Sequence, residues 1–343
     1  HCRGDGPQES PGVLGPVSSG SVARPARFAV SVREIRRRDE QLLPIRLQSG
    51  RAHRMIRFGV LTHGGVGSSG SLSDGCEKAA RAAFNLLRKG SSALDAAMEA
   101  VRILEDDGRF NAGSGSVLRL DGKTIEMDAS LMDSHGNIGI VIAIRNVKNP
   151  ILVAREVMNT PHVALSSAGA EKFALLKKFQ KHPGPTNEIR QRHRKLVKML
   201  RAKDSKIGNK WREVDLKKIW NFQTPYENVF ESDTVGAVAI DKNGLLAVAN
   251  STGGASPMLN GRVGDSPMIG CGFYAGTSAA VATTGVGEEI IRHQLAKYVY
   301  DLIKYGEEVG SATKKGVELF PKEVPIGVIA ISRRGFGISA NKE

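Results

Sequence analysis

The strands that this sequence predicts are apolar on both of their faces, which narrows the folds that the chain can adopt. Residues 234–240 form one uncharged apolar run, and residues 245–250 form another. Asn243-Gly244 stands between the two runs, and Asn-Gly is a typical two-residue turn of a β-hairpin. A sheet that is apolar on both faces has to be covered on both faces, most often by helices.

The remaining elements follow from the same apolar periodicity. We expect further strands at 56–62, 124–130, 138–144, 272–276, 279–284, 326–332 and 336–340. We expect helices at 73–89 with Ser73 as the N-cap, and at 92–107, 151–158, 168–180, 187–202, 286–304 and 307–319. These elements predict an α/β (α+β) fold in which two sheets face each other beneath outer helices. That arrangement is a four-layer αββα sandwich.

The first 54 residues differ in composition from the rest of the chain. They are rich in Pro, Gly, Ser and Arg, and no helical or strand period persists in them except near 30–43. Met55 directly precedes the first strong strand pattern. We therefore expect the native protein to begin at Met55, residues 1–54 to be a non-native or disordered extension, and residues 55–343 to form a single domain.

The formal net charge of +14 suggests a nucleic-acid partner, but the distribution of charge argues against one. Residues 1–54 carry ten Arg against five acidic residues, and residues 172–218 carry sixteen Lys or Arg against four acidic residues. The rest of the chain is slightly acidic, and neither basic segment interleaves aromatic residues for base stacking. We interpret residues 181–230 as a solvated, cleavable linker, and a polyanion-binding arm is the alternative.

Several other function classes are disfavoured. The longest apolar run, 138–144, is much shorter than the ~18 residues of a membrane helix. The three cysteines provide neither a disulfide framework nor a CxxC pair, so we expect a reducing compartment, the cytoplasm. The histidines lack HxxxH or HExxH spacing, so no catalytic metal is expected. The glycine-rich segment 63–67 lacks the Gly-Lys-Ser/Thr ending of a phosphate-binding loop.

Thr234 follows Asp233 at the start of an apolar strand, and it allows two interpretations. It is either an ordinary strand residue or a nucleophile that becomes an N-terminus when the chain cuts itself before it. A threonine hydroxyl needs a base beside it. A free α-amine on the same residue, with a pKa near ~8, is such a base. The cut requires the hydroxyl to attack the Asp233 carbonyl, which gives an ester that water opens.

Neighbouring residues suit the same chemistry. Antiparallel pairing in the hairpin returns Thr252 to the vicinity of Thr234, where its hydroxyl can orient the nucleophile. The hydroxyl of Thr284 and a backbone N–H at Gly285 can form an oxyanion hole. Arg262 and Asp265 lie three residues apart in a glycine-flanked loop. Opposite charges at that spacing suit the α-carboxylate and α-ammonium of a free amino acid, although a simple loop salt bridge is the alternative.

Five segments together resemble one known family. They are 104–115 (with Asn111-Ala112-Gly113), 232–241, 250–254, 261–267 and 284–288. The chain from about Met55 onward resembles the plant-type (isoaspartyl peptidase) L-asparaginases, which are N-terminal nucleophile hydrolases. The resemblance implies an αββα fold of that type and cleavage into an α subunit, 55–233, and a β subunit, 234–343. It also implies an (αβ)₂ assembly.

The resemblance also assigns roles to matching residues. Thr234 would be the nucleophile, Thr252 its partner, Arg262 and Asp265 the substrate anchors, Thr284 and Gly285 the oxyanion hole, and Asn111 a support. Backbone carbonyls of a matching loop would hold a structural sodium ion, namely those of Leu104, Glu105, Asp107, Phe110, Ala112 and Ser114. Two features depart from the family. Val286 stands where many members have a second threonine, and the segment before Thr234 is unusually long and basic.

The expected function is hydrolysis of the side-chain amide of L-asparagine, or of β-aspartyl dipeptides, through an ester on Thr234. Both substrates carry the same free α-amino and α-carboxyl groups, so one site can serve both. Hydrolysis of glycosylasparagine is the first alternative, because aspartylglucosaminidases share the fold and an Asp-Thr cleavage pair. An uncleaved basic binding protein without activity is the alternative from another class.

Overall fold

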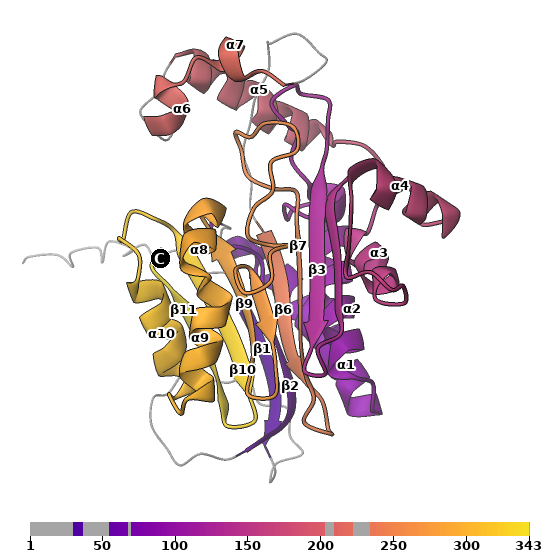
Figure 1. The fold of residues 1–343 in the computed structure, drawn as a ribbon, viewed down its shortest axis with the longest axis vertical. Coiled ribbons are helices and arrows are strands. Elements are labelled where there is room, and N and C mark those ends of the chain that lie inside the picture. Colours follow the sequence, from indigo (N-terminus) through magenta and orange to yellow (C-terminus); the bar gives the residue numbers. More distant parts are fainter. Residues whose placement is uncertain (1–29, 37–54, 68–69, 203–208, 222–233, 343) are drawn as a thin grey trace, which may run out of the picture.

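The computed structural model describes residues 30–36, 55–67, 70–202, 209–221 and 234–342, and it contains two β-sheets (Figure 1). The strands of the larger sheet are, in spatial order, β1 (Val30–Arg36), β2 (Ile56–His63), β6 (Thr234–Ile240), β7 (Leu246–Thr252), β3 (Met127–Asp133), β4 (Ile138–Ile144) and β5 (Ala164–Ser166). The strands of the smaller sheet are β11 (Gly335–Ala340), β10 (Ile326–Ser332), β9 (Ala280–Gly285) and β8 (Phe273–Ala275).

Helices cover the outer face of each sheet (Figure 1). The larger sheet packs against α1 (Ser73–Lys89), α2 (Ala93–Asp106), α3 (Pro150–Val157) and α4 (Ser167–Leu176). The smaller sheet packs against α8 (Gly287–His293), α9 (Leu295–Lys304) and α10 (Val309–Glu318). A third apolar cluster joins the inner faces of the two sheets. The expected mixed α/β class with two sheets is therefore confirmed.

Strand β6 shows why these strands have no polar face. Val235, Ala237 and Ala239 pack against the outer helices. Val238 and Ile240, which point the opposite way because side chains alternate along a strand, pack between the sheets. All seven residues of β6 are buried. The apolar run in the sequence is thus the consequence of a position between two cores.

Some expected boundaries were wrong. The helix expected at 286–304 is two helices, because Gln294 adopts a left-handed conformation with φ +46° between α8 and α9. Ser73 is the first residue of α1 and does not cap it, since Leu72 occupies the N-cap. Ser92 does cap α2, and its side chain accepts a hydrogen bond from the Asp95 N–H at 3.1 Å.

Two segments that were expected to be an extension and a linker contain regular structure, and in the second the helix expected at 187–202 is confirmed as α5. Within residues 1–54, β1 pairs antiparallel with β2, from Val30 opposite His63 to Arg36 opposite Ile56. Within residues 181–230, the structure describes α5 (Asn187–Arg201), α6 (Asn209–Glu213) and α7 (Leu216–Ile219). These helices form a basic lobe whose apolar side packs on Leu120 and Leu259. The domain boundary at Met55 stays a prediction.

The described helices include none that is long and apolar enough to cross a bilayer.

Candidate active site

Thr234 and Thr252 lie opposite each other at one end of the β6–β7 hairpin. Thr234 is the first residue of β6, Thr252 is the last residue of β7, and the antiparallel register pairs them. The Thr234 hydroxyl donates to Thr252 Oγ1 at 3.1 Å, and Thr252 Oγ1 also accepts the Gly254 N–H at 3.0 Å. Ser266 Oγ lies 3.5 Å from Thr234 Oγ1. A hydrogen-bonded hydroxyl with a fixed direction is what a threonine nucleophile needs.

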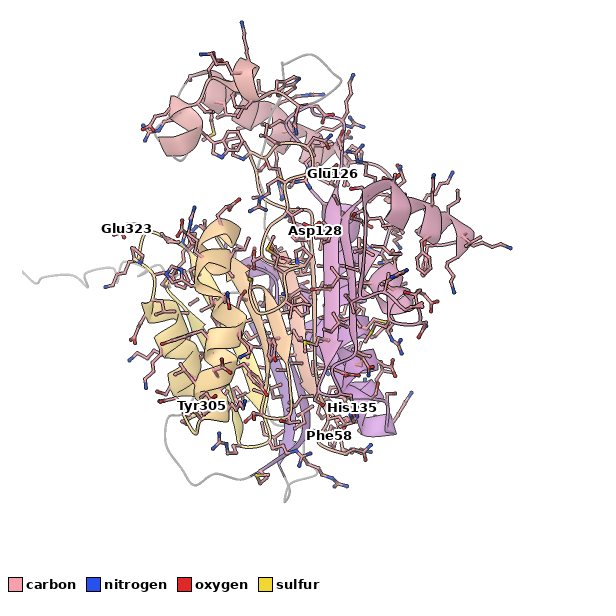
Figure 2. All side chains as sticks on the ribbon, in the orientation of Figure 1. Phe58, Glu126, Asp128, His135, Tyr305 and Glu323 are labelled. Carbon is pink, nitrogen blue, oxygen red and sulfur yellow. The ribbon has the colours of Figure 1, made fainter. Side chains whose placement is uncertain are left out.

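A small cavity of about 40 Å³ opens beside these two threonines. It is lined by Thr234, Thr252, Gly254, Ala255, Arg262, Gly264, Asp265, Ser266, Thr284 and Gly285. The cavity therefore brings together six residues that the sequence singled out from four separate segments. Figure 2 places Asp128 near the upper end of β3, and Asp128 is the register partner of Thr252, so the cavity lies at that end of the larger sheet.

A larger cavity of about 450 Å³ lies elsewhere, between α4 and the segment that follows β4. Its lining includes Arg145, Lys172 and His182 but none of the candidate site residues, and no Ser, Thr or Cys is among the residues that line it. This cavity, and an open one of about 500 Å³ along α1, both exceed the cavity beside the threonines in volume. The smaller one is the better candidate for catalysis because it contains the hydroxyl groups.

Arg262 and Asp265 both line the cavity, and Arg262 pairs with Glu288 and not with Asp265, so the alternative of a simple salt bridge within the loop is wrong. The Arg262 guanidinium forms two parallel bonds to Glu288, Nε to Oε1 at 2.9 Å and Nη2 to Oε2 at 2.9 Å. Asp265 Oδ2 instead accepts a hydrogen bond from Thr283 at 3.3 Å. A Cβ placed on Gly287 would lie 2.8 Å from Asp265 Oδ1 and 2.9 Å from Arg262 Nη2. The Asp265 carboxylate and the Arg262 guanidinium therefore both lie next to Gly287.

Asp265 is buried, and burial raises its pKa to about 6, although the nearby Arg262 charge acts in the opposite direction. Glu288 was part of a recognised motif, but the sequence analysis gave it no role. Burial alone would raise the pKa of Glu288, yet its bonds to Arg262 bring that pKa below the ordinary value. Glu288 is therefore a charged partner that holds the Arg262 guanidinium in place.

Thr284 and Gly285 end β9 on the opposite side of the cavity. Gly285 has φ +144°, and a Cβ at this position would collide with the carbonyl oxygen of Pro325. Only glycine fits this backbone, so the main chain is the part of Gly285 that can act at the cavity.

Asn111 supports the segment that follows Thr252. Its Nδ2 donates to the Gly254 carbonyl at 2.8 Å, and its Oδ1 accepts the Val117 N–H at 3.0 Å. The Asn111 carbonyl accepts the Gly253 N–H at 2.9 Å. Asn111 therefore holds the loop beside Thr252, and its supporting role in the reaction stays a prediction.

The loop expected to hold sodium brings several backbone carbonyl oxygens together. The described residues contain no cluster of three His, Cys, Asp or Glu side chains that could hold a metal. Oxygen atoms crowd this loop, because a Cβ on Gly113 would lie 2.6 Å from the Glu105 carbonyl oxygen. The carbonyls of Asp107, Phe110 and Ala112 each accept a local N–H bond, which leaves each a second lone pair. Such oxygens are the ligands that hard cations prefer. The sodium ion stays a prediction.

Glu105 is a buried acid behind the site whose side chain the sequence analysis did not single out. Its Oε1 accepts hydrogen bonds from Ser251 Oγ at 2.7 Å and from the Ile151 N–H at 3.0 Å. Ser251 directly precedes Thr252. Burial raises the pKa of Glu105 to about 8, against the opposing effect of these bonds. The acid is therefore largely neutral at pH 7.

We expect Glu105→Gln to remove a pH dependence of stability. The folded protein holds a proton on Glu105 that the unfolded chain releases near its ordinary pKa of 4.5, so stability falls as pH rises toward 8. Relative to Glu105→Gln, the wild type should lose roughly 1 kcal/mol per pH unit between about pH 5 and pH 8. Melting temperatures across this range measure the difference. Glu99→Gln, at a partly buried glutamate of α2 that pairs with Arg102, is the control, and equal slopes in wild type and Glu105→Gln would contradict the prediction.

The chain is similar in sequence to known asparaginases. A family model described as Asparaginase matches residues 60–343. The plant-type L-asparaginase of Pyrococcus furiosus is 40% identical over 287 residues, which cover 80% of this chain and 90% of that protein. The isoaspartyl peptidase/L-asparaginase of Rattus norvegicus is 39% identical over 287 residues, or 80% of each chain. These matches confirm the resemblance that the motifs indicated.

Proposed function

Because this chain belongs to the asparaginase family, a family of hydrolases, we propose that it is a threonine amidohydrolase that activates itself by cutting the Asp233–Thr234 bond. It hydrolyses the side-chain amide of L-asparagine, the isopeptide bond of β-aspartyl dipeptides, or both. One observation carries the proposal: the Thr234 hydroxyl lies 3.1 Å from Thr252 Oγ1 beside a cavity that Arg262 and Asp265 also line. Two facing sheets beneath outer helices support an N-terminal nucleophile fold. Asp233 lies outside the described residues.

Activation begins with the hydroxyl of Thr234. Its oxygen attacks the carbonyl carbon of Asp233, the peptide nitrogen leaves with a proton, and an ester links Asp233 to Thr234 Oγ1. Water then hydrolyses the ester, which gives a carboxylate on Asp233 and a free α-amine on Thr234. That amine is the base that the uncut chain lacks.

Turnover uses the same hydroxyl on a substrate carbonyl. The Thr234 amine takes the hydroxyl proton, and Oγ1 attacks the side-chain carbonyl carbon of asparagine. The Thr284 hydroxyl and the Gly285 N–H stabilise the oxyanion. The amine returns its proton to the leaving ammonia, and water hydrolyses the β-aspartyl ester to release L-aspartate. Thr252 keeps the Thr234 hydroxyl aligned throughout.

The α-groups of the substrate bind the convergent charges. The α-carboxylate pairs with Arg262, whose Nη1 is not used in the Glu288 bonds, and the α-ammonium pairs with Asp265. We also propose an (αβ)₂ assembly and a sodium ion on the carbonyls near Phe110, as the family resemblance implies.

Substrate affinity should fall at acidic pH, since only ionised Asp265 can bind an ammonium group. Protonation of the Thr234 α-amine lowers kcat/KM below about pH 8, and with the Asp265 pKa raised to about 6 the slope should steepen by a further factor of about ten per pH unit below that value. Steady-state kinetics on L-asparagine between about pH 5 and pH 8 measure the profile. Burial also raises the pKa of Asp128 to about 6, so Asp128→Asn is the matched control and should keep the dependence. A wild-type profile without this steepening would contradict the role of Asp265.

One experiment tests the proposal as a whole. The purified protein is run on a denaturing gel, and the N-terminus of the smaller band is sequenced while ammonia release from L-asparagine is assayed. A fragment beginning Thr-Val-Gly-Ala, together with ammonia, is the expected result. A single uncut band that releases no ammonia would overturn the proposal and favour a basic binding protein.

A further inference from the structure

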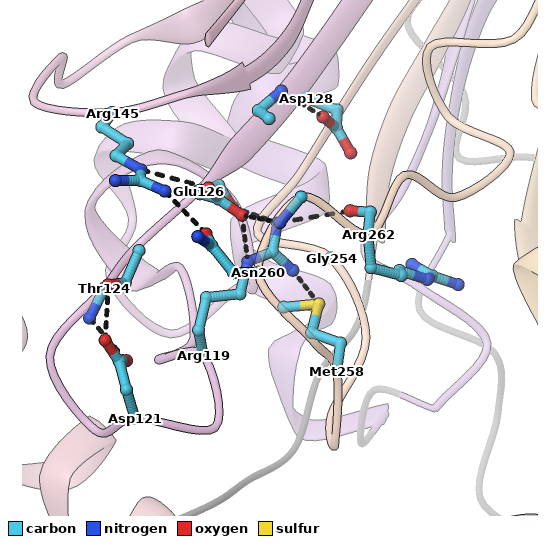
Figure 3. Close-up of polar contacts among 12 residues, drawn as sticks. Arg119, Asp121, Thr124, Glu126, Asp128, Arg145, Gly254, Met258, Asn260 and Arg262 are labelled. Atoms are coloured by element: carbon cyan, nitrogen blue, oxygen red, sulfur yellow. Dashed lines mark hydrogen bonds and ion pairs between the residues drawn. The ribbon is translucent and has the colours of Figure 1, made fainter. Parts of the chain in front are cut away.

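A buried ion pair lies beneath the loop that leads from Thr252 to Arg262, and no step of the reaction above uses it. The Arg119 side chain is 0% exposed, and its Nε donates to Glu126 Oε2 at 2.9 Å (Figure 3). A buried charge is costly unless it is paired and its remaining donors are used. The position of those donors indicates what the pair does.

The remaining donors of Arg119 point at the loop 254–262. Nη2 lies 3.5 Å from the Arg262 carbonyl oxygen, and Nη1 contacts Met258 Sδ (Figure 3). Gly254 has φ +88°, and a Cβ there would lie 2.7 Å from Nη1, so the loop rests directly on the guanidinium. Glu126 Oε2 in turn accepts the Gly261 N–H at 2.8 Å. Both ends of the loop are thus in contact with the pair.

A second arm of the network reaches the basic lobe. Arg145 donates through Nε to Glu126 Oε1 at 3.1 Å and through Nη2 to Asn260 Oδ1 at 2.6 Å. The backbone of Asn260 exchanges two hydrogen bonds with the Asn221 side chain, at 2.8 Å and 3.1 Å. Asn221 follows α7, so the loop is held between the buried pair and the lobe.

We propose that Arg119 and Glu126 are positioning residues that fix the loop 254–262, and with it the Arg262 guanidinium, for substrate binding. The inference rests on the proposed function, because it takes Arg262 as the anchor of the α-carboxylate. The Gly254 end of the loop has a second support, since Asn111 binds the Gly254 carbonyl. Loss of Arg119 should therefore act mainly at the Arg262 end, on binding rather than on the nucleophile.

The test compares Arg119→Gln and Arg119→Lys with the wild type in the full, cleaved protein. For Arg119→Gln we expect KM for L-asparagine and Kd for L-aspartate to rise about tenfold, with kcat changed by less than about threefold. Hydrogen exchange of the amides in 254–262 should accelerate. Arg119→Lys keeps the charge beside Glu126 but not the planar fork, so it should restore part of the affinity. Arg334→Gln, which removes an arginine bond to the Ile303 carbonyl, is the control for a general loss of stability.

The outcomes separate this inference from the proposed function. If Arg119→Gln lowers only the melting temperature, with KM, L-aspartate affinity and loop exchange unchanged, the pair is merely structural and the inference is wrong. An equal rise of KM in Arg334→Gln would also overturn it. If the wild type releases no ammonia but loop exchange still accelerates in Arg119→Gln, the proposed function fails while the positioning of the loop stands.

A second variant keeps the test decisive if Arg119→Gln does not fold. Arg145→Gln leaves the buried pair intact and removes only the half-exposed arm, which includes the bond to Asn260. We expect KM to rise about threefold and the amides near Asn260 to exchange faster. Wild-type values for both quantities in Arg145→Gln and in Arg119→Lys would overturn the proposal.

Discussion

Thr234→Ala should leave the chain uncut and lower ammonia release from L-asparagine by at least about 10³-fold, because it removes the nucleophile of both reactions. Thr234→Ser keeps a hydroxyl and should retain part of each activity. Serine lacks the methyl group that fixes the χ1 angle of threonine, so its hydroxyl is less well aligned with Thr252. A denaturing gel measures the cut, and an ammonia assay measures turnover.

Thr62→Ala is the matched control for this substitution. Thr62 is also a buried strand threonine of the larger sheet, and its hydroxyl donates to the Cys76 carbonyl at 2.9 Å. The control variant should still be cut and should still release ammonia. Cutting of Thr234→Ala at the wild-type rate would contradict the proposed nucleophile, whatever the effect on turnover.

Arg262→Ala is the substitution with the second largest expected effect, a loss of about 10²–10³-fold in kcat/KM for L-asparagine. It removes the cation for the α-carboxylate and leaves Glu288 without its partner at the edge of the cavity. The loss should appear mostly in KM, since Thr234 and Thr252 do not contact this side chain. Self-cleavage should continue, because it needs no α-carboxylate.

Arg292→Ala controls for charge on the same side of the molecule. Arg292 lies on α8 and pairs with Glu289, the residue that follows Glu288. Such a pair contributes little, so its kinetics should stay within about twofold of the wild type. Equal effects of Arg262→Ala and Arg292→Ala would mean that general electrostatics, and not a specific anchor, governs affinity.

The sequence predicted the architecture well where a strand lies between two cores. Every residue of 234–240 is buried, and nothing but an apolar run is compatible with that position. The hairpin returns Thr252 to Thr234, as expected from the sequence, but the two-residue Asn243-Gly244 turn was wrong. The loop has three residues, 242–244, because Asp241 pairs with Leu245, and this register places Thr252 opposite Thr234. Motif spacing then supplied the residues from other segments.

The sequence was less informative where long-range contacts override local preference. Nothing near Gln294 signals the left-handed residue that separates α8 from α9. Motif spacing placed Arg262 and Asp265 at the site, but it did not show that Glu288, on a different element, offers the Arg262 guanidinium two parallel bonds. Arg119 would have been expected at the surface, and only the tertiary structure shows the carboxylate that allows its burial.

The strand order of the larger sheet has a consequence for the protein after it is cut. Strands β6 and β7 lie side by side, with β2 on one flank and β3 on the other, and both flanking strands precede Thr234 in the chain. A break before Thr234 would therefore turn one polypeptide into two that are interleaved within a single hydrogen-bonded layer. The two chains could separate only if the hydrogen bonds of β6 to β2 and of β7 to β3 were all broken. Each αβ unit of the mature protein would thus consist of two chains that folded together as one, and neither chain could be exchanged without unfolding.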